Sequence, residues 1–286
     1  MEALPLGPGE LDLAATLDSG QTFHWQASGK GFAGALGEEG LFLEQPSPRE
    51  LWCSRGAVER VRRYFALDLS LKEVRRGFPL AEDPIVREAM ALFPGLRILR
   101  QPLWECLASF LMSALKQVVH IRQCSLRLRQ ELGRPLGSGV WAFPSPERVA
   151  EAGEGKLREW GLGYRAKSVA LAAEKLVAEP GWLESLEAWP TEEARRALCA
   201  ECHGVGEKIA DCLLLFGYGR SEVFPVDVWT ERVLRELEGG KRRKWPMPKL
   251  RDWARRELGP HAGWLQQFLF HWARTTRMAG AGERPG

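Results

Sequence analysis

Long hydrophobic runs are absent from this chain. No stretch approaches the roughly 18 consecutive apolar residues that a membrane-spanning helix requires, and Met1–Pro5 begins neither a basic segment nor an apolar core of the kind that directs secretion. These absences argue against an integral membrane protein and against export. They predict a protein that stays in the cytoplasm.

Cysteine is sparse and scattered. None of the six cysteines follows Cys212, which excludes a C-terminal four-cysteine iron–sulfur cluster, and no two Cys/His pairs have the spacing of a zinc site. Cys199, Cys202 and His203 match the pattern of covalent haem attachment. That interpretation is disfavoured, because haem is attached in exported proteins and would block the glycine turn after His203. We expect reduced thiols, and neither a metal nor a cofactor.

Charge of one sign is not in large excess, since the formal net charge is +3. Its distribution is nevertheless uneven. Residues 1–50 carry two basic side chains against eight acidic ones, whereas residues 229–286 carry thirteen against six. A basic C-terminal part suits a protein that lays one face on a polyanion. The run Lys241–Lys244 either belongs to that face or is only a solvated loop.

What is present is a chain of 286 residues, 45% of them hydrophobic, which is long enough to bury a core shared by two or three subdomains. Its first fifty residues alternate short β-type runs with glycine-rich turns. The expected strands are Gln21–Trp25, Gly31–Leu36 and Leu41–Glu44, with Gly37–Gly40 as a hairpin turn. This pattern predicts an antiparallel sheet.

From about Val58 the apolar residues follow a helical period. The helices predicted beyond it are Leu103 to Ala114, a stretch around Ile121, and segments near 146–160, 165–178 and 191–199. Glu207–Phe216 is apolar on much of its circumference, which predicts a buried helix. The predicted fold class is therefore α+β, with an N-terminal antiparallel sheet followed by a mostly helical part.

The most informative stretch is Gly204-Val205-Gly206, which separates the segment near 191–199 from the helix that begins at Glu207. Two glycines before a helix expose backbone amides, and the helix adds a partial positive charge at its N-terminus. Such a turn binds a phosphate. Two helices joined in this way form a helix-hairpin-helix, which holds a DNA backbone without reading bases.

Lys208 stands in the first turn of that helix, where the dipole and apolar neighbours disfavour its protonated form. A neutral amine can attack a sugar C1′, expel a base and leave a Schiff base. The alternative is a lysine that only contacts a phosphate or water. Asp227, which follows Pro225 and Val226, favours catalysis. It is expected to cap the next helix, and a capped carboxylate can stabilise a positively charged sugar.

These motifs resemble those of base-excision DNA glycosylases, and the chain from about Leu11 to Thr276 is similar to the 8-oxoguanine DNA glycosylase family. The other segments that carry the resemblance are Ser19–Trp25, Arg63–Asp68, Leu99–Gln101, Glu105–Leu107, Leu162–Ala166 and Gly259–Trp264. It implies an N-terminal glycosylase-like domain over 1–98, a helix-hairpin-helix glycosylase domain over 99–277 and a disordered tail over 278–286.

The resemblance also implies a role for individual residues. Lys208 would be the Schiff-base nucleophile, and Asp227 would stabilise the developing charge and assist proton transfers. The carbonyl of Gly20 would accept the N7 hydrogen that 8-oxoguanine has and guanine lacks. Because normal guanine offers a lone pair at N7 instead, that one acceptor is a physical basis for recognising the damaged base.

Other positions match the family's base pocket and its DNA contacts. Cys212 and Phe270 would sandwich the base once it is extruded from the duplex, and Gln266 would bond its Watson–Crick edge. Tyr164 and Arg165 would fill the vacated space in the duplex. The alternatives are that Cys212 and Phe270 are plain core residues and that Gln266 and Arg165 lie on the surface.

The chain departs from the family's pattern at several DNA contacts. Ala114–Gln117 replaces an asparagine-rich turn that reads the orphaned cytosine, and His120 replaces an arginine. Only Arg165 remains of the expected cytosine readers, which predicts a relaxed preference for the opposite base. Trp229 stands where a histidine usually contacts a phosphate, and His203 replaces a proline before the glycine turn.

The sequence therefore predicts a bifunctional DNA glycosylase and AP lyase of base excision repair. Its partner would be duplex DNA that contains an oxidised purine, it would act as a monomer without a cofactor, and in a bacterium it would associate with the nucleoid. Two alternatives are a monofunctional alkylpurine DNA glycosylase and a non-catalytic helix-hairpin-helix DNA-binding protein. Lys208 argues against the first, which would activate water with Asp227 alone.

Overall fold

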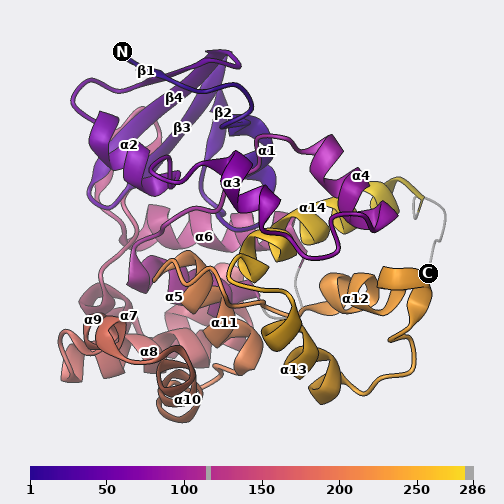
Figure 1. Ribbon diagram of the computed structural model, residues 1–286. Coiled ribbons are helices and arrows are strands. Elements are labelled where there is room, and N and C mark those ends of the chain that lie inside the picture. Colours follow the sequence, from indigo (N-terminus) through magenta and orange to yellow (C-terminus); the bar gives the residue numbers. More distant parts are fainter. Residues whose placement is uncertain (114–116, 281–286) are drawn as a thin grey trace.

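The computed structural model describes residues 1–113 and 117–280. Its N-terminal part holds a five-stranded antiparallel sheet with the order β1-β5-β4-β3-β2. The strands are β1 (Glu2–Pro5), β2 (Gln26–Ser28), β3 (Gly31–Leu36), β4 (Glu39–Ser47) and β5 (Glu50–Cys53). The sheet lies at one end of the molecule and most of the helices lie beyond it (Figure 1), so the predicted fold class is confirmed.

Two of the three predicted strands are confirmed as β3 and β4, which are joined by a turn where Gly37 has a φ of +60°. The third, Gln21–Trp25, was wrongly predicted, because this segment is irregular and β2 begins only at Gln26. Side chains take the place of a partner strand there. Gln101 Nε2 donates to the carbonyl of Gln21 at 2.8 Å, and Gln21 Oε1 accepts from the amide of Leu99 at 2.8 Å.

Short helices surround the sheet and a helical body follows. The helices up to the small hairpin β6 (Pro135–Gly137) and β7 (Val140–Trp141) are α1 (Leu13–Asp18), α2 (Val58–Tyr64), α3 (Leu71–Arg76), α4 (Pro84–Leu92), α5 (Leu103–Ser113) and α6 (Val118–Leu132). The later ones are α7 (Pro146–Leu157), α8 (Arg165–Ala178), α9 (Trp182–Ser185), α10 (Thr191–Glu201), α11 (Glu207–Phe216), α12 (Val228–Gly240), α13 (Met247–Glu257) and α14 (Ala262–Gly280). A π-helical turn over Arg158–Leu162 follows α7, and a 3₁₀ turn over Leu186–Ala188 follows α9.

The predicted helices are confirmed, with differences at their ends. The α-helix predicted near 146–160 is interrupted at Gly153, where φ is +71°, and ends at Leu157. A π-helical turn replaces its last residues and includes Gly161, whose φ of +90° is not that of a regular helix. Ala114, the expected end of α5, lies outside the described residues. At the C-terminus α14 continues to Gly280, past the expected boundary at 277, and residues 281–286 are not described.

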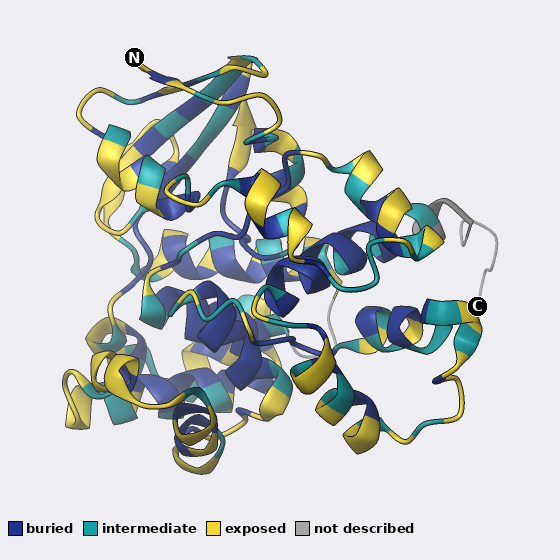
Figure 2. Ribbon diagram, viewed as in Figure 1, coloured by how far each residue is buried: buried dark blue, intermediate teal, exposed yellow. Residues whose placement is uncertain are grey.

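The buried core has two parts, which Figure 2 shows as the dark blue segments of the ribbon. The smaller one lies under the sheet and includes Leu43, Leu51 and Phe65. The larger one runs through the helices, among them α11, which is buried at every residue from Ile209 to Phe216 as predicted. α14 packs against α4 and α12, while α11 packs against α5 and α10. No described helix has the length and apolar character needed to cross a membrane.

Candidate active site

α10, the glycine turn and α11 form the predicted helix-hairpin-helix. Gly204 has a φ of +82°, and a Cβ atom there would stand 2.3 Å from Ser168 Oγ, so only glycine fits. Gly206 needs no special backbone angle, because its φ is −98°. Gly206 instead leaves free space at the start of α11, since no heavy atom lies within 4 Å of the position that a Cβ would take. Within the described part of the chain no side-chain hydrogen bond caps α11, which leaves its N-terminus open to an anion.

The middle residue of the turn, Val205, points inward. Its side chain is buried, and its amide donates to the carbonyl of Cys202 at 3.1 Å. A phosphate at this turn would therefore meet the amides around Gly206 rather than that of Val205. His203 Nδ1 lies 3.1 Å from Ser168 Oγ, and Cys202 is buried. A buried Cys202 cannot carry a haem, so that interpretation of the cysteine motif has no structural support.

Lys208 lies half-buried on the first turn of α11. Its Nζ is 5.1 Å from the centroid of the Phe110 ring on α5, and this ring in turn stacks on Phe216 at 5.4 Å. The amine therefore stands against an apolar wall at the mouth of the helix-hairpin-helix. Such a place removes water from around a nucleophile without closing it off from a ligand.

Cys212 follows Lys208 by one helical turn and is buried. Burial raises the pKa of its thiol to about 11, the charge of Lys208 opposes that rise, and the charges of Asp211 and Asp227 add to it. The thiol is therefore neutral at physiological pH. The charges of the predicted nucleophile Lys208 and of its predicted partner Asp227 thus both act on this predicted pocket residue.

Asp227 caps α12 as expected. Its Oδ1 accepts hydrogen bonds from the amide of Thr230 at 2.8 Å and from the Thr230 hydroxyl at 3.0 Å, while its own amide donates to that hydroxyl at 2.9 Å. This reciprocal pair is a capping box. Among the described residues no hydrogen-bond donor is found for Asp227 Oδ2, which leaves that oxygen for chemistry. Sequence reasoning missed Thr230, although its spacing of three residues from Asp227 is a capping signal.

The predicted base-pocket residues also meet, although they come from opposite ends of the chain. A Cβ atom at Gly20, where φ is +79°, would stand 3.0 Å from Phe270 Cε1 on α14. Gln266, on the same helix, is only 4% exposed, so the surface alternative was wrong for it. Its buried Oε1 has no hydrogen-bond partner within the described part of the chain. A buried acceptor is rarely left unpaired, and a ligand with a donor would satisfy it.

The predicted DNA contacts differ in their exposure. Tyr164 is 56% exposed at the start of α8, whereas Arg165 is buried, with its Cζ 4.3 Å from the centroid of the Tyr164 ring. The surface alternative was therefore wrong for Arg165. His120 is exposed on α6, and Trp229 is half-buried beside Asp227. The Ala114–Lys116 part of the predicted opposite-base turn lies outside the described residues.

The basic run between α12 and α13 is not simply a solvated loop. Lys241, Arg243 and Lys244 are exposed, but Arg242 is buried and lies 3.5 Å from the centroid of the Trp253 ring. Its guanidinium also pairs with Glu238. Arg242 therefore holds α13 to α12, while two of its exposed neighbours, Lys241 and Arg243, pair with Glu238 and Glu236.

A helix-hairpin-helix with an open N-terminus, a lysine against an apolar wall and a capped aspartate together form a candidate DNA glycosylase site. Residues 3–107 match the model of the 8-oxoguanine DNA glycosylase N-terminal domain, and residues 108–256 match that of the HhH-GPD superfamily of base excision DNA repair proteins. The chain belongs to the 8-oxoguanine DNA glycosylase family. It is a bifunctional N-glycosylase/DNA lyase of base excision repair, so both alternative functions were wrong.

Relatives from three organisms support this membership. The N-glycosylase/DNA lyase of Arabidopsis thaliana is 32% identical over 93% of this chain and 78% of its own length. A probable N-glycosylase/DNA lyase of Methanothermobacter thermautotrophicus is 29% identical over 93% of this chain and 94% of its own length. The Clostridium acetobutylicum 8-oxoguanine glycosylase/lyase, solved with double-stranded DNA containing cytosine opposite 8-oxoguanine, has a TM-score of 0.86 and 26% identity over 94% of this chain and 93% of its own.

Proposed function

We propose that Lys208 is the nucleophile of this enzyme and that Asp227 is its electrostatic partner. The amine of Lys208 bonds to C1′ of the damaged nucleotide as the bond from C1′ to the base breaks, and the base leaves with that electron pair and takes up a proton. Asp227 Oδ2, which has no donor among the described residues, stabilises the positive charge that develops on the sugar. The adduct loses the amine proton and its C1′–O4′ bond breaks, with the electron pair and a proton going to O4′, which leaves a Schiff base between Lys208 and the opened sugar. That Schiff base then permits β-elimination, which nicks the strand.

The observation that carries this proposal is the placement of Lys208 on the first turn of α11, with its Nζ 5.1 Å from the centroid of the Phe110 ring and the buried Cys212 one helical turn further on. The neutral thiol would face one side of the extruded base. On the α14 side, Phe270 in contact with Gly20 supports a second wall, and the unpaired oxygen of Gln266 supports a contact with a donor on the base edge.

The partner we propose is duplex DNA that contains an oxidised purine. The open N-terminus of α11 would hold one phosphate, and exposed Tyr164 would enter the space that the base leaves, with Arg165 behind its ring. Trp229 and His120 would contact the backbone and the opposite strand. The monomeric state and the cytoplasmic, nucleoid-associated location stay predictions.

Borohydride trapping tests the role of Lys208 directly. We expect wild-type protein to form a covalent adduct with duplex DNA containing 8-oxoguanine, and Lys208→Gln to form none while still binding the duplex, because only an amine can form the reducible Schiff base. Lys72→Gln, at an exposed site on α3, is the matched control and should trap normally. Undiminished trapping by Lys208→Gln would overturn the assignment.

The same duplexes, made with C, T, G or A opposite 8-oxoguanine, test the proposed relaxed preference. Because His120 is exposed in place of the expected arginine and Arg165 is buried against Tyr164, we expect similar single-turnover excision rates for the four pairs. A strong preference for cytosine would contradict this expectation. It would show that other residues replace the missing cytosine readers.

A further inference from the structure

In the backbone segment 18–21, at the end of α1, three of the four carbonyls each accept a hydrogen bond from a different side chain. The donors are Arg274 Nη2 to the carbonyl of Asp18, Gln267 Nε2 to that of Ser19 at 2.9 Å, and Gln101 Nε2 to that of Gln21 at 2.8 Å. Between them stands the carbonyl of Gly20, for which no donor is found in the described part of the chain. Of these four consecutive carbonyls, that of Gly20, the proposed reader of the damaged base, is therefore the only one to which no donor from residues 1–113 or 117–280 is directed.

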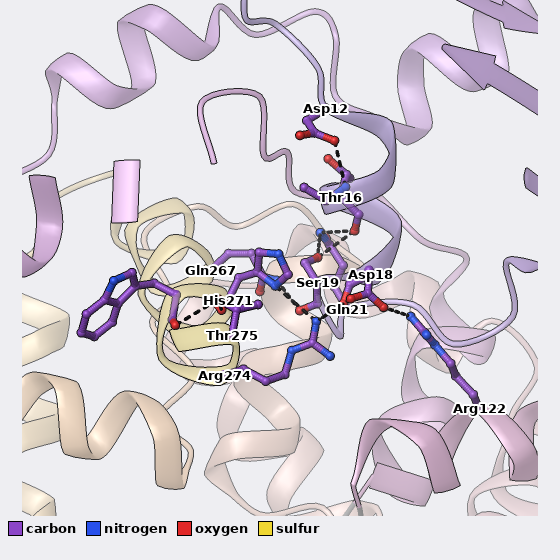
Figure 3. Close-up of polar contacts among 12 residues, drawn as sticks. Asp12, Thr16, Asp18, Ser19, Gln21, Arg122, Gln267, His271, Arg274 and Thr275 are labelled. Atoms are coloured by element: carbon purple, nitrogen blue, oxygen red, sulfur yellow. Dashed lines mark hydrogen bonds and ion pairs between the residues drawn. The ribbon is translucent and has the colours of Figure 1, made fainter. Parts of the chain in front are cut away.

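Two of the three donors to this segment, Gln267 and Arg274, lie on one face of α14, which also carries Phe270 and His271. Gln267, Phe270, His271 and Arg274 recur at spacings of three, one and three residues, which places them along one side of a helix. Figure 3 shows Gln267, His271 and Arg274 turned toward the end of α1. The face of α14 that carries Phe270, the proposed stacking partner of the base, thus also holds the backbone on either side of Ser19.

The outer end of the segment is tied to a third helix. The carboxylate of Asp18 pairs with Arg122 on α6 at 2.6 Å and with Arg274 on α14 at 3.0 Å. The inner end is buried more completely, because Gln267 is 2% exposed and Ser19 is fully covered. A hydrogen bond in such a dry place is costly to break without a replacement.

We propose that Gln267 and Gln101 are positioning residues that fix the direction of the Gly20 carbonyl and so set the selectivity for 8-oxoguanine over guanine. A carbonyl that could turn away would relieve its repulsion with the N7 lone pair of guanine at little cost. A carbonyl whose two neighbours are both held cannot turn away, so its repulsion with guanine N7 lowers the affinity for guanine by its full amount. This inference rests on the proposed role of Gly20.

The test uses Gln267→Met and Gln101→Met, which keep the volume but remove the donor. In a Lys208→Gln background, the ratio of dissociation constants for guanine-containing and 8-oxoguanine-containing duplexes is measured for each. We expect that ratio to fall about tenfold in both variants relative to the parent chain, the effect of losing one buried hydrogen bond or slightly more. Thr275→Ala, at an exposed site on α14 whose hydroxyl bonds only within the helix, should not change it.

Cleavage of a preformed abasic site separates positioning from damage to the fold. That reaction needs Lys208 but no base, so in chains with Lys208 intact the two methionine variants should lose excision of 8-oxoguanine more than abasic-site cleavage. Equal losses of both activities, or unchanged selectivity in both variants, would overturn the inference and leave the proposed function standing. If the parent chain itself shows no selectivity, the proposed role of Gly20 fails instead.

Discussion

At the scale of single residues, the arrangement around Asp227 divides the work between its two carboxylate oxygens. Both donors from Thr230 reach Oδ1, one through the amide and one through the hydroxyl. The hydroxyl also accepts a hydrogen bond from the amide of Asp227, so it holds both the backbone and the carboxylate of this residue. In the proposed mechanism Asp227 Oδ2 acts on the sugar, and the direction of this oxygen depends on how firmly Thr230 holds the other one.

Thr230→Val tests this division. The valine keeps the shape and the backbone amide but removes the hydroxyl, so the carboxylate gains freedom to rotate. We expect the single-turnover rate of 8-oxoguanine excision to fall about tenfold, consistent with the loss of roughly 1 to 1.5 kcal/mol of hydrogen bonding. DNA affinity should stay near that of the wild type, because the carboxylate and its charge remain.

The conservative variant Thr230→Ser is the matched control, since it restores a hydroxyl at the same place. Excision should recover most of the wild-type rate in that variant. If Thr230→Val were as active as wild type, the hydroxyl would have no part in orienting Asp227, and the capping box would serve only to start α12.

Sequence reasoning reached the residues whose signals are local. Lys208 comes shortly after the glycine turn and Asp227 directly before α12, so the adjacent residues in the sequence were enough to predict the position of both. Gln267 was missed, because its partner is the carbonyl of Ser19 at the far end of the chain, and a glutamine on a helix gives no sign of such a contact. The family resemblance pointed to Gln266 but carried no information about its neighbour.

At the scale of elements, regular periodicity was enough to predict most helices. α8 and α11 have the bounds that the apolar pattern indicated, because burial on one face or all round leaves a clear repeat. Gln21–Trp25 has the composition of a strand but is irregular. Its hydrogen bonds go to side chains from other parts of the chain, among them Gln101, so no local pattern could distinguish it from an edge strand.

The contact between α10 and α11 depends on one buried ion pair. Arg195 on α10 meets Asp211 on α11, with Arg195 Nε 2.5 Å from Asp211 Oδ1 and both side chains almost fully covered. Burial raises the pKa of Asp211, and the charge of Arg195 works against that rise. The pair joins the two helices on either side of the glycine turn, so it holds the helix-hairpin-helix in shape.

Arg195→Leu should therefore destabilise the fold strongly. Removing the guanidinium leaves a buried carboxylate with only Arg255, at 3.7 Å, to compensate its charge. We expect the free energy of unfolding in urea at neutral pH to fall by about 3 to 5 kcal/mol. Arg196→Leu, at the exposed neighbouring site, should change it by no more than about 0.5 kcal/mol.

The double variant Arg195→Leu with Asp211→Leu adds a second check on the same pair. Replacing both charges with apolar side chains removes the unpaired carboxylate, so most of the lost stability should return. A single variant within about 1 kcal/mol of wild type would show instead that Asp211 is compensated without Arg195.

At the scale of the whole molecule, the N-terminal region and the helical body share the larger of the two hydrophobic clusters. Phe23 packs edge-on against Phe110 at 5.9 Å, and Phe78 does the same against Phe268 on α14 at 5.9 Å. Both pairs join the N-terminal region to the helical body and belong to the larger buried cluster. The proposed base pocket depends on this union, because Gly20 comes from the N-terminal region and Phe270 from α14 of the helical body.

A fragment of residues 99–277 should accordingly fail to fold as the intact chain does. It keeps α5 to α13 and most of α14, but it exposes the apolar surface that Phe23, Phe78 and Val86 cover. We expect a broad, non-cooperative urea transition and binding of a hydrophobic dye, with no Schiff-base trapping, whereas the full chain unfolds in one sharp step. A cooperative transition in the fragment would show that the helix-hairpin-helix body is stable alone. The N-terminal region would then serve only to supply Gly20 and its neighbours to the base pocket.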